Sequence, residues 1–472
     1  MDLVMRIKSW MPDLAKSELP RYQAISNAIC EVIDGGQAVI GEKLPPHRTL
    51  AAALKVTVGT VSRAYARLEE QGRVMSRIGD GTYVLARQTP LPDRPLEGED
   101  EPAPAGLVDL GRNVIVDIGQ DLALAETLLD ISQDAASRQR VLDYQAECGH
   151  PWHRAVAARW LGQFGIASGP DRVAVTNGAQ HALACLLRIL TMPGDTVLCE
   201  ALSYPGIVAL AQQMRLQLLC VEVDEEGIVP ESLEQMCRAF DSRLLFCVPT
   251  LHNPTTATMS LERRLRIVDI ARRHHLQIIE DATPAVLLPS PPPALAALLP
   301  EQVFFVASLS KSVSPGLRFG VVQAPRAWSG KLAAVIRANC WMATPIAVEI
   351  ACRWMEDGRL QQLLDAQRAD IANRRQLAAS YLEGQQWLSH PGSPHCWLHL
   401  PAPWRTSEFS TMLRRRQVAI KSGDAFTVGR TPSPHAVRLC LSGAGTLTQL
   451  EHGLAILRQT LQDGPEAFLA EA

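Results

Sequence analysis

The sequence predicts an α/β protein in which a small helical domain precedes a large domain built on a mainly parallel sheet. From about residue 170 onward, short apolar runs alternate with helix-like segments, which is typical of parallel strands covered by helices. The first 90 residues instead carry short helical patterns and one hairpin signal. Between these parts, residues 93–101 read DRPLEGEDE and lie among five prolines, a composition that cannot bury a core.

The bulk composition is that of a globular protein, with 47% hydrophobic and 20% charged residues and a net charge of −3. At 472 residues the chain exceeds what one core usually supports, so two or three domains are expected. No apolar run is long enough to span a membrane, and the start, MDLVMRIKSW, lacks the order of a signal peptide.

The 11 cysteines have no C-x-x-C spacing and lie mostly in apolar runs, which favours reduced thiols in a cytoplasmic protein. Two pairs, His150 with His153 and His395 with Cys396, offer half of a zinc-ligand set each. Because neither pair has the other half nearby in the sequence, we expect solvated or hydrogen-bonded histidines and no metal site.

The front part has the pattern of a helix–turn–helix followed by a hairpin. One helix is predicted over residues 20–34, with apolar side chains on one stripe, and a second over HRTLAAAL, residues 47–54. KVTVG then makes a turn before a third helix, TVSRAYARLEEQG. Two short strands around Gly79-Asp80-Gly81 complete the pattern.

This pattern suits DNA, because the third helix can enter the major groove while arginines contact phosphates. The alternative is a helical docking domain with solvated arginines, which the weak charge of residues 1–90 (12 Lys and Arg against 9 Asp and Glu) would favour by itself. The order of the elements favours DNA. The candidate DNA contacts are Arg48, Thr57, Gly59, Thr60, Ser62, Arg63, Arg77 and Gly81.

Residues 44–84, LPPHRTLAAALKVTVGTVSRAYARLEEQGRVMSRIGDGTYV, resemble the winged helix of GntR-type bacterial regulators. The resemblance implies double-stranded operator DNA as a partner. It departs from the family pattern at Val58, where an arginine often follows the Ser or Thr of the recognition turn. The operator sequence therefore cannot be carried over from relatives.

In the back part, polar side chains follow successive predicted strands, where ligands of parallel sheets gather. A helix start favours a phosphate, a buried acid can protonate a pyridine nitrogen, and a lysine can form a Schiff base with an aldehyde. Pyridoxal 5'-phosphate carries the three matching groups, a phosphate, a pyridine nitrogen and an aldehyde, so we predict it as the cofactor. The candidate binding residues are Gly178, Ala179, Gln180, Tyr204, Asn253, Asp281, Ser308, Ser310, Lys311 and Arg318, with Lys311 as the catalytic residue.

Residues 107–460 resemble fold-type I aminotransferases. TNGAQ is similar to the phosphate loop, HNPTT to the "NP(T/S)G" motif, IIED to the aspartate strand, and SLSKSVSPGLRFG to the lysine motif. AVRLCLSGA is similar to a strand whose arginine binds the substrate carboxylate, which implies that role for Arg438; a structural salt bridge is the alternative.

Two departures put efficient transamination in doubt. Family members usually carry a tyrosine shortly after the aspartate, where this chain has Thr283 and Pro284, and HNPTT lacks the usual glycine.

A GntR winged helix joined to an aminotransferase-like domain resembles the MocR subfamily of regulators.

The MocR resemblance implies a homodimer that senses an amino acid or related amine through aldimine exchange at Lys311. A working aminotransferase with an attached DNA-binding domain is the alternative, and a scaffold that has lost its cofactor is a further one. The expected division of the chain is a DNA-binding domain (1–87), a linker (88–106), a large cofactor domain (107–365) and a small C-terminal subdomain (366–472).

Overall fold

The computed structural model describes residues 19–34, 38, 42–71, 73–77, 81–84, 106–429 and 433–466. The chain divides into two compact units, Met1–Pro90 and Leu91–Ala472. Each unit is described by itself below. Among the described residues, no helix is long and apolar enough to cross a membrane.

The described residues of the first unit form three helices and an antiparallel hairpin, as predicted. The elements are α2 (Arg21–Asp34), α3 (His47–Leu54), α4 (Val58–Glu70), β1 (Val74–Arg77) and β2 (Gly81–Val84). Ile25, Ile29 and Ile33 of α2 pack with Val61 and Tyr65 of α4 in one core. The ends of the hairpin are described, whereas residues 79 and 80 of the predicted turn lie outside the described part.

Helix α4 begins earlier than the sequence pattern predicted. Thr57 caps the helix, since its Oγ1 accepts from the backbone N–H of Thr60 at 3.2 Å, and Val58 is already helical. The predicted turn KVTVG therefore ends at Thr57. The reason is local: a threonine at the cap position satisfies an N–H group that would otherwise have no partner.

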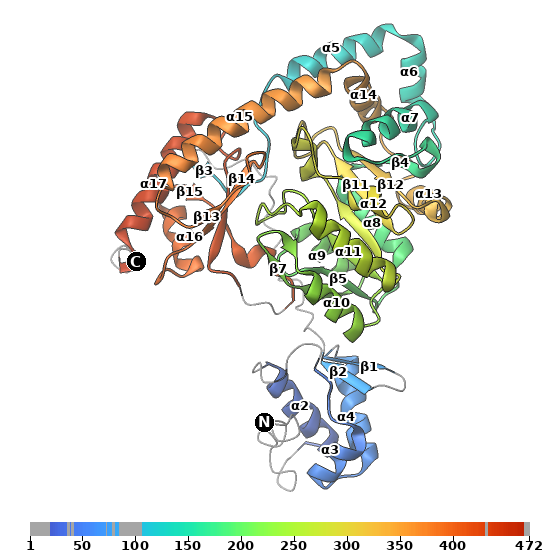
Figure 1. Cartoon of the computed structure of the whole chain (residues 1–472), viewed down its shortest axis with the longest axis vertical. Coiled ribbons are helices and arrows are strands. Elements are labelled where there is room, and N and C mark those ends of the chain that lie inside the picture. Colours follow the sequence, from blue (N-terminus) through green and yellow to red (C-terminus); the bar gives the residue numbers. More distant parts are fainter. Residues whose placement is uncertain are drawn as a thin grey trace. The chain divides into compact units, whose positions relative to one another are not determined.

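The second unit is built on a seven-stranded sheet with the strand order β4-β12-β11-β10-β9-β5-β6 (Figure 1). The strands are β4 (Val173–Asn177), β5 (Thr196–Glu200), β6 (Gln217–Val221), β9 (Leu244–Cys247), β10 (Gln277–Asp281), β11 (Val303–Ser308) and β12 (Phe319–Gln323). Only β12 runs antiparallel to its neighbours, which confirms a mainly parallel sheet. The apolar run LQLLCVEV, residues 216–223, does not form one strand: β6 ends at Val221, and after Glu222 the strand β7 (Val223–Asp224) pairs with β8 (Gly227–Ile228).

Helices cover both faces of this sheet, and nearly all of its strands are therefore buried. They are α5 (Gln120–Gln133), α6 (Ala135–Leu142), α7 (Pro151–Trp160), α8 (Gly178–Leu190), α9 (Pro205–Gln213), α10 (Pro230–Ala239), α11 (Leu261–Arg273), α12 (Leu295–Leu298), α13 (Ser329–Cys340) and α14 (Pro345–Glu356). Helix α8 packs against β4, β11 and β12, so its N-terminus lies at the end of the central strands.

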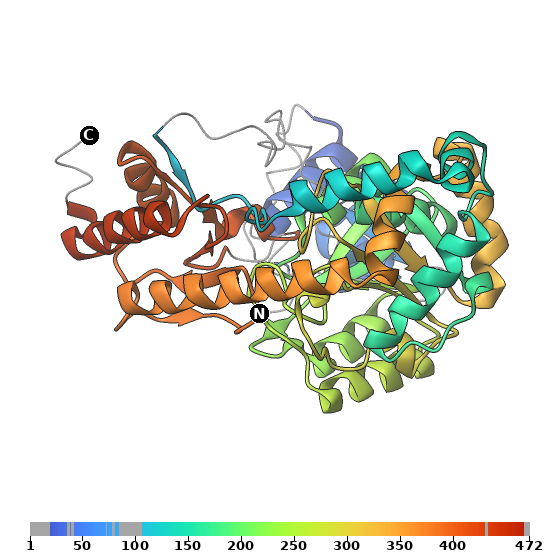
Figure 2. The ribbon, with the colours of Figure 1, turned by 90° about the horizontal axis from the view of Figure 1, so that it is seen from above.

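A smaller subdomain follows along the long helix α15 (Arg359–Tyr381), which extends from one subdomain to the other (Figure 2). Its sheet has the order β13-β14-β17-β16. The remaining elements are β13 (Trp387–Leu388), β14 (His395–His399), α16 (Thr406–Arg415), β15 (Val418–Ala419), β16 (Lys421–Ser422), β17 (Ala436–Cys440) and α17 (Leu447–Asp463).

The start of the second unit also belongs to this smaller core. Strand β3 (Val108–Asp109) pairs with β15, and Val108 and Leu110 pack among the apolar side chains of the small subdomain. The predicted division at residue 107 would assign this segment to the large domain instead. Strand pairing between distant parts of a chain has no signal in local sequence periodicity.

A buried carboxylate ties three helices of the large subdomain together. Glu349 of α14 lies 2.8 Å from Arg140 Nη2 on α6, 2.9 Å from His153 Nε2 on α7 and 3.1 Å from Arg353 Nε. Burial by itself would raise the pKa of this carboxyl, but the hydrogen bonds from His153, Arg140 and Arg353 outweigh burial and hold the pKa well below its usual range.

We expect Glu349→Gln to lower the free energy of unfolding by about 3–5 kcal/mol, because it removes a fully buried negative charge from beside the guanidinium groups of Arg140 and Arg353. Glu356→Gln is the matched control, since Glu356 pairs with Arg159 at the surface of the same helix and should contribute less than about 1 kcal/mol. Urea unfolding of both variants measures the difference. Equal losses would contradict the role given to Glu349.

Candidate functional site

Two segments far apart in the sequence form a cradle for an anion at the N-terminus of α8. Gly178 has a φ of +80°, and a Cβ at this position would lie 2.7 Å from Arg318 Nη2. Arg318 also donates to the carbonyl oxygen of Asn177 at 3.4 Å. A guanidinium group beside the first N–H groups of a helix is suited to a phosphate.

Ala179 and Gln180 continue the first turn of α8 and are half-buried. Gln180 donates from Nε2 to the carbonyl oxygen of Gly206 at 3.1 Å. Tyr204 stands just before α9 and packs against the large core, with its ring beside Gly206. Gln180 and Tyr204 therefore both lie beside Gly206, in the first turn of α9.

The loop after β11 is closed by serines. Ser308 Oγ donates to the carbonyl oxygen of Phe319 at 2.8 Å and lies 2.9 Å from Ser310 Oγ. The backbone N–H of Ser310 donates to Ser308 Oγ at 3.2 Å. Ser308 is fully buried, so its role in this structure is to hold the loop that carries Lys311.

Asp281 is the last residue of β10, which pairs in parallel with β11. Asp281 and the loop that follows β11 therefore lie at the same edge of the sheet. Its Oδ1 accepts from the backbone N–H of Thr283 at 2.9 Å. Burial raises the pKa of this carboxyl above its ordinary value, and the contacts from Thr283 lower it only in part. A protonated ring nitrogen would favour the ionised form of such a carboxylate.

Residues 111–113 lie between the lysine and the predicted carboxylate-binding arginine. Lys311 Nζ donates to the carbonyl oxygen of Asn113 at 2.7 Å. Arg438 Nη2 donates to the carbonyl oxygen of Gly111 at 2.7 Å, and Nη1 donates to Asn253 Oδ1 at 2.8 Å. Arg438 is fully buried, with its guanidinium 4.8 Å from the centre of the Phe426 ring. Both terminal nitrogens of the Arg438 guanidinium thus donate to neutral oxygens, and its role toward a carboxylate stays a prediction.

Sequence reasoning missed the buried polar groups beneath Asn253. Glu200 Oε2 lies 3.4 Å from His252 Nε2, which also lies 3.0 Å from the carbonyl oxygen of Leu202. His395 lies close by, on the strand next to that of Arg438. Burial and then the charge of Arg438 lower the pKa of His395 to about 3. Single histidines and an acid scattered over 200 residues carry no sequence signal of this kind.

The side chains fit pyridoxal phosphate. An anion cradle, a buried carboxylate with a raised pKa and a lysine stand at one edge of the sheet. Among the described residues, no group of three His, Cys, Asp or Glu side chains is arranged to hold a metal ion. His153 instead pairs with Glu349.

In the first unit, the predicted DNA contacts lie in and around α3 and α4. Arg48, Thr57, Gly59 and Arg63 are exposed, while Thr60 and Ser62 are half-buried. Thr57 and Thr60 hydroxyls lie 2.8 Å apart, and Ser62 Oγ lies 2.9 Å from His47 Nδ1.

At the wing, the side chain of Arg77 lies outside the described part, and Gly81 pairs with the backbone of Arg77. Three exposed side chains that the sequence reasoning did not select are Lys43, Lys55 and Val58, the last of which is 44% exposed in the first turn of α4.

A DNA-reading winged helix joined to a pyridoxal-phosphate domain defines a class of bacterial transcriptional regulators. Comparison with known families places the chain in it. Residues 105–457 match the family "Aminotransferase class I and II", and residues 21–84 match "Bacterial regulatory proteins, gntR family". The chain belongs to the aminotransferase class I and II family and, with its GntR head, to the MocR-type regulators; its cofactor is pyridoxal phosphate.

Relatives share this arrangement over nearly their whole length. The chain is 31% identical to the uncharacterized HTH-type transcriptional regulator YdeF of Bacillus subtilis, covering 96% of this chain and 97% of that one. It is 29% identical to the vitamin B6 salvage pathway transcriptional repressor PtsJ of Salmonella typhimurium, covering 89% and 93%.

Among solved structures, the α-aminoadipate aminotransferase LysN of Thermus thermophilus has the same fold. Its TM-score is 0.69 at 22% identity, covering 78% of this chain and 94% of that one.

The low pKa of His395 makes stability depend on pH. The folded state keeps this ring neutral down to about pH 3, whereas the unfolded chain binds a proton below about pH 6.5. Proton binding to the unfolded chain therefore lowers the free energy of unfolding once the pH falls below about 6.5. The loss is about 1 kcal/mol at pH 5.5. His395→Gln should show a smaller loss between pH 8 and 5.5 in urea unfolding. An unchanged pH dependence would argue against a neutral buried ring.

Lys311 is expected to hold the cofactor covalently. The purified protein should be yellow, and borohydride reduction followed by peptide mapping should find the cofactor on the peptide that contains Lys311. Lys311→Ala should lose the visible band. Lys331→Ala is the control, because Lys331 stacks on Trp328 at 4.2 Å on the helix after β12. Retention of an identical spectrum in Lys311→Ala would refute the assignment.

Proposed function

We propose that the chain regulates transcription in the cytoplasm in response to an amino acid or a related amine, bound at Lys311 and Arg438. The observation that carries this proposal is the path from Lys311 through residues 111–113 to Arg438. When bound, pyridoxal phosphate supplies an aldehyde carbon that forms a carbon–nitrogen double bond with an amine.

Each side chain has a proposed part in recognition. Lys311 offers the amine that an effector amine replaces, and Asp281 ionises against a ring nitrogen. Gly178, Ala179 and Gln180, with Ser310 and Arg318, would surround the phosphate, and Ser308 would support them by closing the loop that carries Lys311. Tyr204 would stack on the ring, and Asn253 would donate to its phenolic oxygen. An effector carboxylate would displace the neutral oxygens of Asn253 and Gly111 from Arg438, because a charged bidentate partner binds a guanidinium more strongly.

Displacement of Gly111 provides a route to the DNA-binding unit. Residues 108–113 follow the predicted linker directly in the chain, and they pair with the small subdomain through β3 and β15. An effector that moves this segment changes the position of the end of the linker. This is allosteric control only if the two arrangements differ in their affinity for the effector.

We further propose a homodimer formed through the aminotransferase-like halves, since this fold builds its cofactor site near a subunit interface. Sedimentation of the full chain tests the dimer. Weak transamination is the second candidate function, and the retained Lys311 and Asp281 favour it. Thr283 and Pro284, in place of a tyrosine, oppose it because neither supplies a phenol. Turnover of an amino acid and a keto acid at ~1–10³ per second would establish the enzyme instead.

DNA binding should depend on exposed arginines of the helix–turn–helix. Arg63→Ala and Arg48→Ala are expected to weaken duplex binding several-fold and to lower the salt slope by about one each, because each removes a phosphate contact. Arg21→Ala, an exposed arginine of α2, is the control for loss of charge alone. Fluorescence anisotropy over a salt series measures both quantities, with the visible spectrum unchanged. Equal effects of all three changes would contradict the assigned interface.

Arg438→Lys should separate effector recognition from cofactor binding. Lysine cannot form the planar fork, so amino-acid affinity should fall by roughly ten- to a hundredfold, equivalent to ~1.5–3 kcal/mol, while the visible band and basal DNA binding remain. Spectral titration with amino acids, the matching amines and their esters measures this. If amines lacking a carboxylate act as well as amino acids on the wild type, the effector class is wrong.

A further inference from the structure

Two thiols converge on one histidine beside the phosphate cradle. His181 Nε2 lies 3.3 Å from Cys185 Sγ and 3.5 Å from Cys340 Sγ. Cys185 and His181 are one turn apart on α8, and Cys340 is the last residue of α13. All 11 cysteines lie in the described part, and of these Cys340 alone is exposed while Cys185 is buried.

The protonation of His181 decides between a metal site and a pair of thiols. The backbone N–H of Asn177 donates to His181 Nδ1 at 3.1 Å, so Nδ1 must be the acceptor. Burial lowers the pKa of this ring, which favours its neutral form. The hydrogen is then on Nε2 and points toward the sulfur atoms. A metal ion would need a lone pair at Nε2, and this tautomer has none there.

Asn177 connects the thiols to the cradle. Its Nδ2 donates to Cys340 Sγ at 3.5 Å, and its Oδ1 accepts from the backbone N–H of Thr344 at 2.9 Å. Its carbonyl oxygen accepts from Arg318, and the next residue is Gly178. Any movement of Cys340 or of the turn 341–344 therefore acts directly on the residue that begins the phosphate loop.

We propose that Cys185 and Cys340 form an oxidisable dithiol whose disulfide loosens the cofactor cradle. A peroxide is the oxidant by chemical class. Cys340 Sγ attacks one peroxide oxygen, the O–O bond breaks, and a sulfenic acid and one water form. Cys185 Sγ then attacks that sulfur and releases the second water. Two thiols are oxidised and one hydrogen peroxide is reduced to two waters, so atoms and electrons balance.

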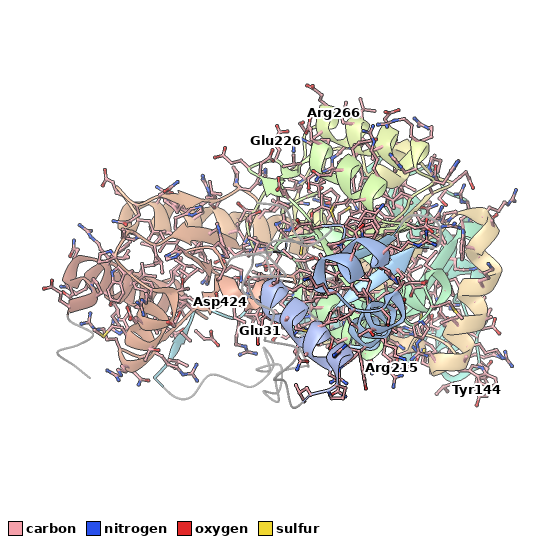
Figure 3. All side chains as sticks on the ribbon, turned by 90° about the horizontal axis from the view of Figure 1, so that it is seen from below. Glu31, Tyr144, Arg215, Glu226, Arg266 and Asp424 are labelled. Atoms are coloured by element: carbon pink, nitrogen blue, oxygen red, sulfur yellow. The ribbon has the colours of Figure 1, made fainter. Side chains whose placement is uncertain are left out.

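The disulfide requires a change of position. Its sulfur atoms must come to about 2 Å from each other, whereas both now contact the same nitrogen. Closing the pair draws the end of α13 toward α8 and takes the Cys340 sulfur away from Asn177. The ring centre of Trp341, the next residue, lies 5.5 Å from that of Tyr144, the two rings are tilted by 48°, and both side chains are exposed. Figure 3 labels Tyr144 at the outer edge of the second unit. This turn is thus at the surface, where a peroxide can reach it.

The rate should rise with pH. Burial raises the pKa of the Cys340 thiol, so only a small fraction is thiolate near pH 7. Below that pKa, the thiolate fraction, and with it the rate of oxidation, should increase about tenfold for each pH unit.

The experiment treats the full holoprotein with hydrogen peroxide, blocks the remaining thiols and maps the tryptic peptides. Residues 173–188 hold Cys185 and residues 338–353 hold Cys340 with Cys352, so fragmentation must identify the linked residue. The expected product is a Cys185–Cys340 link that dithiothreitol reverses. Cofactor release, followed by the visible band during dialysis, should be about tenfold faster in the oxidised protein.

Variants separate the thiol pair from general oxidation. Cys340→Ser should prevent both the link and the faster release, and Cys185→Ser should do the same. Cys237→Ser is the matched control, since burial raises the pKa of Cys237 to about 11, as it does for Cys185. If Cys185→Ser does not fold, the exposed Cys340→Ser decides.

Each other outcome counts against the proposal. Absence of the link, or stoichiometric zinc binding that needs all three side chains, overturns the dithiol. A link without faster cofactor release overturns its coupling to the cradle. The proposal concerns the same site as the proposed function, yet the link and the release are measured without effector or DNA, so failure of the sensing proposal would leave both readouts intact.

Discussion

The return of the chain after β11 is the constraint on which the cofactor site depends. Strand β12 runs antiparallel into the sheet between β11 and β4, and Ser308 closes the intervening loop by its bond to the carbonyl oxygen of Phe319. A Cβ at Gly320 would lie 2.6 Å from the carbonyl carbon of Gly178, so only glycine allows the two backbones this approach. Without it, Arg318 would not stand beside Gly178 at the N-terminus of α8.

The parts of the structure that sequence could predict are those with a local signal. Apolar periodicity predicted the helices of the first unit, and the alternation of apolar runs with helix-like segments predicted the mainly parallel sheet of the second. Strand ends were informative since parallel strands bring their carboxyl ends to one edge. The roles of Lys311, Asp281 and Arg438 came from motif resemblance, and they remain predictions until the variants are measured.

What sequence could not predict are contacts between segments that share no pattern. The pairing of β3 with β15 places residue 108 in the small subdomain, and the carbonyl oxygens of Gly111 and Asn113 meet Arg438 and Lys311. Backbone acceptors carry no side-chain signature, so no composition argument could have found them. The same holds for His181, whose interest arises only when α13 brings Cys340 to it.

Arg438 contacts residues of both the large and the small subdomain. Its guanidinium lies over Phe426 of the small subdomain while it donates to Asn253 of the large one. Burial and then the positive charge of Arg438 lower the pKa of His395 and keep its ring neutral, because two positive charges in one buried space would repel each other. Protonating His395 would place a second positive charge beside Arg438 in the same buried space, so the cost of acidity falls on the fold that holds the two subdomains together.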